Sequence, residues 1–276
     1  MTPATNTVRD LSLTMRIHIL KHDGFKRREL KAHVPLVLET SQYTVKTVDT
    51  YEEYMQVMRL RHLVFQKEFA QRRFCMRSDR DKYDNHADFI VVRDNRSNTI
   101  VGSYRLLCSE FTKDFYSASE FQIDALLNSP GVKLELSRAC ILREHRNGRV
   151  LNLLWRGIAT YMQKVNARFF FGCGSVQTMD SHELRLMEQQ FIQEGIRCNR
   201  MHIPVQQKYK MQSGQVDPNA PSKQFDVPPL LKAYFKAGAR ICSEPAIDRK
   251  FKCADFLVVL DTEQIEQSYR ERYVPA

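Results

Sequence analysis

One stretch of the sequence, residues 133–166, constrains the fold more than any other. Its first part alternates apolar and polar residues, which predicts a half-buried strand with Glu135, Ser137 and Arg138 near its middle. A basic loop, residues 143–149, follows the strand. The rest of the stretch has apolar residues at spacings of three and four, which predicts a long amphipathic helix. The predicted apolar stripe consists of Leu151, Leu154, Trp155, Ile158, Met162 and Val165.

These residue types point to chemistry as well as to structure. A carboxylate on a buried strand can accept a proton, and cations before a helix N-terminus can bind an anion. The stretch therefore predicts a base, Glu135, beside an anion-binding loop. The same residues also fit a structural ion pair between Glu135 and Arg138 beside an ordinary solvated loop. The residues by themselves favour neither interpretation.

Two segments carry a family resemblance. ELSRACI, residues 135–141, and REHRNGRVLNLLWRGI, residues 143–158, resemble the GNAT acyltransferase superfamily. Within it, they look most like the bacterial N-acyltransferases that make ornithine lipids, often labelled hemolysins, and like the N-acyl amino acid synthases. The related acyl-homoserine lactone synthases share the E-x-S-R strand. The resemblance runs from about residue 51 to residue 261, and is strongest in residues 135–174 and 228–260.

The resemblance implies an α/β (α+β) fold, in which helices flank a mixed, mostly antiparallel sheet with splayed strands. We expect this GNAT-like domain over residues 45–276, after a basic N-terminal extension of residues 1–44. Apolar residues alternate with Lys, Arg and His in the extension, so it could rest on an anionic membrane surface. It could equally pack on the domain or trail from it, and its short polar face favours this second interpretation.

Composition limits the class of protein. The chain has 276 residues, of which 43% are hydrophobic and 27% are charged, as in globular proteins. The seven cysteines form no CxxC pair and are odd in number, which suits buried thiols in a reducing compartment. No apolar run approaches the roughly 20 residues that cross a bilayer, and no signal-peptide core precedes the first basic residues. We therefore expect a cytoplasmic enzyme.

The net charge of +10 calls for an anionic partner. Nucleic acid, anionic lipid and an acidic protein are the general candidates. Nucleic acid is the weakest of them, because the sequence has no zinc-finger spacing, no RNP-like aromatic pattern and no helix-turn-helix signature. An acidic protein and an anionic membrane surface are the partners that stay open.

Two motifs point to the acceptor site. Arg61 and Phe65 match the R-x-x-x-F of the lactone synthases, and Asp81 and Asp84 match their D-x-x-D pair. The resemblance implies that these residues hold an acceptor amine, or that the carboxylates fix Arg61. A salt-bridged lid explains the aspartates at least as well as direct contact with substrate.

Gly102 and Arg105, in VGSYRL, correspond to the G-x-x-R of these enzymes. There the arginine supports the carboxylate on the neighbouring strand, so we expect Arg105 to pair with Glu135. The expected catalytic set is Glu135, Arg138 and Arg105. Burial would raise the pKa of Glu135, and either arginine would lower it.

A further strand, residues 168–171, leads into Gly172, Cys173, Gly174 and Ser175. In GNAT folds this strand splays from its neighbour, and the acyl-pantetheine arm enters the gap. The resemblance therefore places Gly174 and Ser175 against substrate, and glycine permits the close approach of a ligand. Cys173 is a poor candidate for a nucleophile, because the sequence places no histidine beside it to activate the thiol.

The basic loop determines the expected donor. Typical CoA-dependent GNAT enzymes carry R/Q-x-x-G-x-G/A, whose amides bind a pyrophosphate. Here Gly148 comes one place early and the second glycine is missing, which suits a single phosphate at a helix N-terminus. Acyl carrier protein presents one phosphate on an acidic surface, which would also account for the positive charge. The expected phosphopantetheine and carrier-protein site consists of Arg143, Arg146, Gly148, Arg149 and Arg156.

The expected function is that of an N-acyltransferase that makes a lyso-aminolipid. It would move a long acyl chain, with or without a 3-hydroxyl group, from acyl carrier protein to the α-amine of an amino acid, and the resemblance favours ornithine. Acyl-CoA is the alternative donor, and no metal or other cofactor is expected, since no His, Asp or Glu spacing suggests one. The alternatives are a lactone synthase and a non-catalytic, membrane-active binding protein of the same fold. Membrane contact, if present, would be peripheral.

Overall fold

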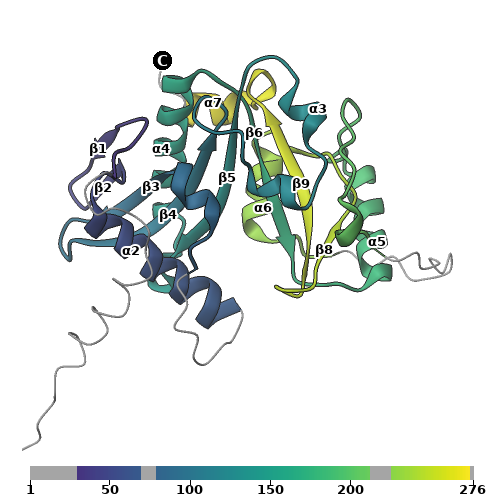
Figure 1. The fold of residues 1–276 in the computed structure, drawn as a ribbon, viewed down its shortest axis with the longest axis horizontal. Coiled ribbons are helices and arrows are strands. Elements are labelled where there is room, and N and C mark those ends of the chain that lie inside the picture. Colours follow the sequence, from purple (N-terminus) through teal and green to yellow (C-terminus); the bar gives the residue numbers. More distant parts are fainter. Residues whose placement is uncertain (1–29, 70–78, 212–224, 274–276) are drawn as a thin grey trace, which may run out of the picture.

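The computed structural model describes residues 30–69, 79–211 and 225–273 (Figure 1). These residues form a nine-stranded sheet in the order β1-β2-β3-β4-β5-β6-β9-β7, with β8 also paired to β9. The strands are β1 (Val37–Glu39), β2 (Tyr43–Thr47), β3 (Asp88–Asp94), β4 (Thr99–Cys108), β5 (Val132–Ile141), β6 (Ala167–Val176), β7 (Arg240–Ile241), β8 (Ala246–Asp248) and β9 (Cys253–Asp261). The α-helices are α2 (Tyr51–Arg61), α3 (Asp124–Leu127), α4 (Arg149–Val165), α5 (Ser181–Gln193), α6 (Pro229–Lys236) and α7 (Gln267–Tyr273). A π-helix (His62–Phe69) continues α2, and short 3-10 turns include η2 (Lys82–His86), η3 (Tyr116–Ser119), η4 (Arg143–His145), η5 (Gln207–Tyr209) and η6 (Thr262–Gln264).

The sheet parts in its middle. Its strand pairs are antiparallel except β5 and β6, which are parallel. Pairing between β5 and β6 ends at Glu135 and Phe171, although β5 runs on to Ile141 and β6 to Val176. Beyond that point β5 pairs only with β4, and β6 only with β9. The sheet is thus mixed, mostly antiparallel and splayed, as the resemblance implied.

A β-bulge bends β5 just after the strands part. Two residues of β5, Arg138 and Ala139, lie opposite the single residue Tyr104 of β4. Arg138 adopts a φ of 52°, a left-handed conformation that costs about 1–2 kcal/mol for a residue other than glycine. A bulge bends its strand and changes the direction of the side chains that follow, so it re-aims this part of β5.

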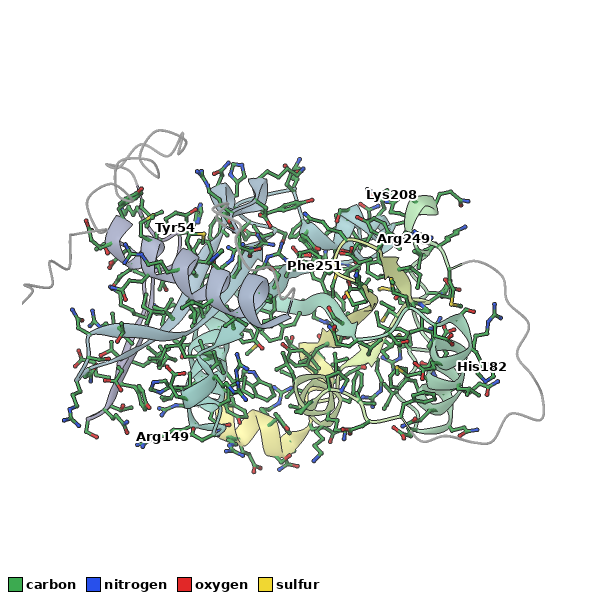
Figure 2. The ribbon with its side chains drawn as sticks, turned by 90° about the horizontal axis from the view of Figure 1, so that it is seen from below. Tyr54, Arg149, His182, Lys208, Arg249 and Phe251 are labelled. Atoms are coloured by element: carbon green, nitrogen blue, oxygen red, sulfur yellow. The ribbon has the colours of Figure 1, made fainter. Side chains whose placement is uncertain are left out.

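Helices cover both faces of the sheet. Helix α4 packs on one face through Val150, Leu154 and Ile158, and α2 covers the other through Tyr54 and Val57. Figure 2 shows this arrangement, with Tyr54 on one side of the sheet and Arg149, the first residue of α4, on the other. The basic loop before α4 and helix α2 therefore lie on opposite faces of the sheet.

Helix α4 has clear boundaries and a wider buried face than predicted. It begins after Gly148, with a φ of 86°, and ends at Asn166, with a φ of 50°, two residue types that tolerate this conformation. Gly157 lies closest to the sheet: a Cβ atom there would come within 2.7 Å of Val45 Cγ1. Trp155, predicted for the apolar stripe, is only partly buried because it faces a cavity.

The folded domain begins earlier than residue 45. Strand β1 and the first residues of β2 fall within the expected extension, and both pair with the sheet. The basic residues for which membrane contact was predicted precede residue 30 and lie outside the described residues. In the part of the chain that the structure describes, no helix is both long and apolar enough to cross a bilayer.

The contact of α4 with the sheet predicts the effect of Gly157→Ala. We expect the free energy of unfolding to fall by about 1–2 kcal/mol. Overpacking costs about 1–3 kcal/mol, and the better helix propensity of alanine returns at most about 1 kcal/mol. Lys164→Ala, at an exposed position of the same helix, is the matched control and should change little. Urea denaturation measures both, and a Gly157→Ala protein as stable as the control would contradict the close packing.

Candidate active site

A buried network of three arginines and three aspartates lies beside the point where β5 and β6 part. At its base, Arg61 is fully buried at the end of α2. Its guanidinium donates from Nη1 to Asp84 Oδ1 at 2.8 Å and from Nε to Asp79 Oδ2 at 3.0 Å. Arg61 therefore ties the segment before β3 to α2. Of the two predicted roles for the D-x-x-D pair, this geometry supports the fixing of Arg61.

Arg105 and Arg138 complete the network through Asp81. Arg105 Nη1 donates to Asp81 Oδ1 at 2.6 Å and to Asp84 Oδ1 at 2.9 Å, and Arg138 Nη2 donates to Asp81 Oδ2 at 3.1 Å. Burial opposes ionisation of Asp81, but Arg105 and then Arg138 outweigh it, so the pKa of Asp81 lies below its usual value. Phe65 lies beside this network, its ring centroid 6.0 Å from the Arg138 guanidinium. Both predicted carboxylates are thus neutralised by arginines.

Glu135 lies on β5, two residues before the Ser137 that Arg105 contacts, and it is fully buried. Its carboxylate accepts hydrogen bonds from the Tyr116 backbone N–H at 2.8 Å, and from both the backbone N–H (2.6 Å) and the hydroxyl of Ser117. These donors belong to η3, so Glu135 binds the start of that turn. Burial raises the pKa of Glu135, although the Ser117 bonds and the charge of Arg105 oppose the rise.

The predicted pairing of Arg105 with Glu135 is not what the geometry shows. Besides the two aspartates, Arg105 donates from Nε to Ser137 Oγ at 2.9 Å, and it acts on Glu135 only through space. Arg105 Nη2 is buried and has no hydrogen-bond partner among the described residues. The Nη2 group of Arg105 can therefore donate a hydrogen bond to a further acceptor.

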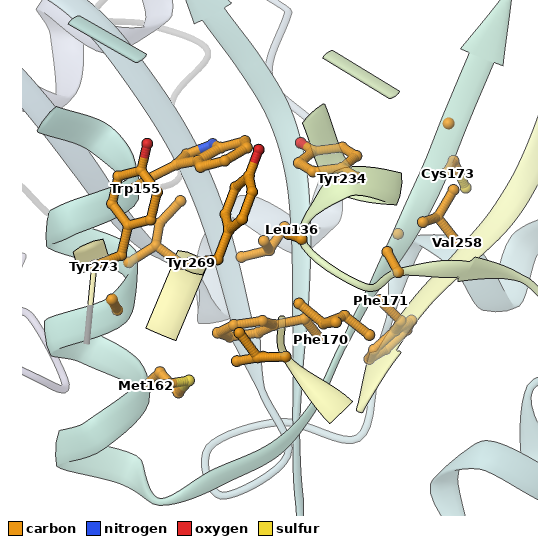
Figure 3. Close-up of a pocket in the computed structure, with 18 residues that line it drawn as sticks. Leu136, Trp155, Met162, Phe170, Phe171, Cys173, Tyr234, Val258, Tyr269 and Tyr273 are labelled. Carbon is orange, nitrogen blue, oxygen red and sulfur yellow. The ribbon is translucent and has the colours of Figure 1, made fainter. Parts of the chain in front are cut away.

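An apolar cavity of about 130 Å³ occupies the gap between the parted strands (Figure 3). Trp155, Tyr269 and Tyr273 gather at one end, and Cys173 lies at the other. The Trp155 ring centroid is 5.4 Å from that of Tyr273 and 5.8 Å from that of Tyr269. Gly172, Gly174 and Leu136 line the wall of the cavity where the strands part. Such a space suits an acyl chain that enters between β5 and β6.

The glycines of β6 are required by close packing. A Cβ atom on Gly172 would come within 2.3 Å of the Leu136 carbonyl oxygen, and one on Gly174 within 2.4 Å of Leu231 Cδ2. Gly174 is therefore part of the cavity wall, where it was predicted to meet substrate. Ser175 points away from the cavity and donates a hydrogen bond to Asp255.

Cys173 connects the cavity to Glu135. Its Sγ lies 3.5 Å from Ser117 Oγ and 3.7 Å from Glu120 Oε2. Burial and the surrounding carboxylates raise the pKa of the Cys173 thiol well above its usual value, which disfavours the thiolate. The thiol is therefore poorly suited to be a nucleophile, in agreement with the expectation from the sequence.

Glu120 belongs to a second group of buried acids that sequence reasoning missed. Glu120, Asp248 and Asp255 each offer an oxygen within 4.8 Å of the others, and all three side chains are buried. Asp255 could have been noticed in the sequence, because it is an acid near the start of the strand β9, directly before an apolar run. Ser117 had no such signal, since only the fold brings η3 against β5.

The predicted donor residues lie at the start of α4 and are exposed. Arg149 donates from Nη1 to Gln42 Oε1 at 2.7 Å, and Arg146 donates from Nε to the Ile141 carbonyl at 2.9 Å. Arg143 is the first residue of this basic loop, and Arg156 follows at an exposed position of α4. Arg143, Arg146, Gly148, Arg149 and Arg156 are thus all exposed within the loop before α4 and the first turns of that helix. Arg149 lies on the side of the molecule away from Lys208 and Arg249 (Figure 2).

Two curated proteins of similar sequence carry the same name. An L-ornithine N(alpha)-acyltransferase of Rhizobium meliloti (strain 1021) is 34% identical over 211 residues, which cover 71% of this chain and 70% of that one. One of Brucella abortus (strain 2308) is 30% identical over 234 residues, 78% of this chain and 82% of that one.

A family model and a solved structure are also similar to this chain. The family described as the acetyltransferase (GNAT) domain matches residues 60–156. The structure of FeeM, an N-acyl amino acid synthase from uncultured soil microbes, has a TM-score of 0.45 at 8% identity, over 87% of this chain and 97% of that one. On the sequence identity and coverage of the two curated relatives, this chain belongs to the family of the L-ornithine N(alpha)-acyltransferases, within the GNAT acyltransferases.

Proposed function

We propose that this protein transfers a long acyl chain from acyl carrier protein to the α-amine of ornithine, and so forms a lyso-aminolipid. The observation that carries the proposal is the apolar cavity between β5 and β6, which ends at Cys173 beside the Ser117–Glu135 pair. The name of the curated relatives supports ornithine as the acceptor. The cavity would hold the acyl chain, with its thioester where the strands part.

The reaction requires removal of a proton from the acceptor amine. Glu135 is the base we propose, but both of its oxygens face η3, so an amine would reach it through Ser117. In this scheme the amine nitrogen attacks the thioester carbonyl carbon and passes its proton to Ser117 Oγ, which gives its own proton to Glu135. The C–N bond forms, the C–S bond breaks, and the proton returns to the departing thiolate.

Two further groups suit the same reaction. Backbone N–H groups freed where β5 and β6 part can bind the oxygen on which negative charge develops. Arg105, with its unpartnered Nη2, can bind the carboxylate of the amino acid. Arg138 would hold Asp81 and keep the network neutral beside the acceptor.

Carrier protein is the donor we favour over acyl-CoA. Exposed arginines surround the N-terminus of α4, where one phosphate can bind, and they can also meet an acidic protein surface. The loop lacks the second glycine with which CoA-dependent relatives bind a pyrophosphate.

The proposed base predicts the effect of Glu135→Gln. Turnover should fall by about 10²–10⁴-fold, because the amide cannot accept the amine proton. Both oxygens of Glu135 accept hydrogen bonds, so the amide nitrogen of glutamine would face a donor, and thermal unfolding must be measured alongside activity. Glu110→Gln, at an exposed position, removes the same charge and should leave turnover unchanged.

Ser117→Ala separates proton relay from fold. It removes the hydroxyl but keeps the two backbone N–H groups that bind Glu135, so kcat should fall while the thermal midpoint changes little.

A folded Glu135→Gln protein with near-normal activity between pH 7 and 9 would eliminate Glu135 as the base.

The donor proposal predicts a salt-sensitive preference. Acyl carrier protein should give a higher kcat/KM than acyl-CoA of equal chain length, and the ratio should shrink with added salt, because exposed charges are screened over about 8 Å at physiological ionic strength. Arg149→Glu or Arg156→Glu should raise KM for the carrier more than for acyl-CoA. Lys164→Glu, at an exposed position near the other end of α4, is the control with the same charge change. Equal use of both donors at low and high salt would refute the carrier-protein assignment.

A further inference from the structure

The second group of acids, Glu120, Asp248 and Asp255, is buried without a counter-charge from the part of the chain that the structure describes. Buried carboxylates are normally paired with a cation or fully hydrogen-bonded, because an isolated buried charge is costly. Among the described residues, no Lys or Arg side chain forms an ion pair with any of the three. This contrasts with the neighbouring aspartates, each of which is held by an arginine. The cluster is therefore short of positive charge.

The hydrogen bonds of the cluster leave one oxygen free. Glu120 is 1% exposed, and its Oε1 has no hydrogen-bond partner among the described residues. Asp255 accepts from Ser175, and Asp248 Oδ1 accepts from the backbone N–H groups of Lys250 (2.7 Å) and Phe251 (3.0 Å). Burial, reinforced by Asp255, raises the pKa of Glu120 to about 9. A hydrogen bond from the Tyr116 side chain opposes this rise in pKa. Glu120 Oε1 is nevertheless a buried acceptor that the described residues leave without a hydrogen bond.

The cluster lies next to the reaction centre. Glu120 Oε2 is 3.7 Å from Cys173 Sγ, Cys173 Sγ is 3.5 Å from Ser117 Oγ, and Ser117 binds Glu135. Cys173 also lines the acyl cavity, at its edge in Figure 3. A short molecule at Ser117 would therefore reach Glu120 with its far end. Ser175, which donates a hydrogen bond to Asp255, is exposed, so the cluster lies one hydrogen bond away from the surface.

We propose that Glu120 and Asp255, assisted by Asp248, bind the side-chain ammonium group of a diamino-acid acceptor. An ammonium group has three N–H donors, which matches three carboxylates converging on one point. Its charge would favour the ionised form of Glu120 and would form strong, charge-assisted hydrogen bonds. The inference rests on the proposed function, because it assumes that the α-amine of the acceptor reacts at Ser117.

This arrangement would also explain which amine reacts. Ornithine carries two amines, and either of them could attack a thioester if it were neutral. Carboxylates around the side-chain ammonium would stabilise its protonated form, which cannot act as a nucleophile. Near Ser117 the α-amine meets a proton acceptor instead. The acid cluster would then both bind the substrate and prevent acylation at its side chain.

A divalent cation is the competing occupant of the same carboxylates. Ca²⁺ takes six to eight oxygen ligands and Mg²⁺ six in near-ideal octahedral geometry. The cluster offers three carboxylates, one of which already binds two backbone N–H groups through one oxygen. Three acceptors suit an ammonium group better than a hard cation, and the experiment below distinguishes the two.

The test compares L-ornithine with L-norvaline, which has the same carbon chain without the side-chain amine. Calorimetric titration of the full-length protein should show at least about 10-fold tighter binding of ornithine. In Glu120→Gln and Asp255→Asn, the ratio of kcat/KM for ornithine to that for norvaline should fall by about 10–100-fold, mostly through KM for ornithine. Norvaline should be used as well as before, and Glu110→Gln should keep the ratio of the wild type.

Each contrary result has a distinct meaning. Equal binding of ornithine and norvaline by the wild-type protein would overturn the ammonium site without any variant, even if the protein acylates both. Folded Glu120→Gln and Asp255→Asn proteins that keep the ornithine preference would overturn it as well. Loss of ornithine turnover on addition of a chelator, restored by Mg²⁺ or Mn²⁺, would assign the cluster to a metal. Tight ornithine binding without acylation would instead refute the proposed function and keep the site.

Discussion

The end of pairing between β5 and β6 is the constraint on which the rest of the site depends. After Glu135 and Phe171, the facing backbone groups of two parallel strands no longer bind one another. Backbone donors and acceptors need partners, so the parting of two central strands leaves groups there that a ligand or water can bind. The cavity, the close-packed glycines of β6 and the bulge at Arg138 all occur within a few residues of this point.

Charge is distributed unequally around the splay. On the β4 side, Arg61, Arg105 and Arg138 face an equal number of aspartates, so that network can stay ionised and rigid without a ligand. On the β9 side, no Lys or Arg among the described residues forms an ion pair with Glu120 or Asp255, and the pKa values of both carboxyl groups are raised. A network with balanced charges keeps its arrangement before a ligand binds, and a cluster that is short of positive charge suits the binding of a cation. The two groups are separated by η3 and Cys173.

Much of the fold could be predicted because its signals are local. The alternating strand, the long helix α4 and the hairpin of β3 and β4 follow from patterns of a few residues, and so does the start of α5, where Asp180 caps Glu183 N. The bulge was not predicted, although it has a local signal: the apolar alternation of Leu134 and Leu136 resumes one position late, at Ala139. Such a shift of phase is typical of an inserted residue.

The site was harder to predict, because its contacts join distant segments. The donors to Glu135 come from Tyr116 and Ser117, which no local pattern connects to β5. Arg105 was assigned to the wrong carboxylate, because a motif shows which residues face one cleft but not which of several acids an arginine binds. Glu120 stands in a turn whose sequence resembles any solvated loop, and only tertiary structure buries it.

The far end of the cavity has a consequence for how such a protein can diversify. Two of the rings that gather there, Tyr269 and Tyr273, belong to α7, about a hundred residues from the strands that carry the chemistry. The Tyr273 hydroxyl donates to Asn152 Oδ1, which fixes this helix to α4. Substitutions in α7 can therefore lengthen or shorten the cavity, and with it the space for the acyl chain that we propose it holds, without touching η3, Glu135 or the acids. Tail length and head group would then be separately adjustable traits of one domain.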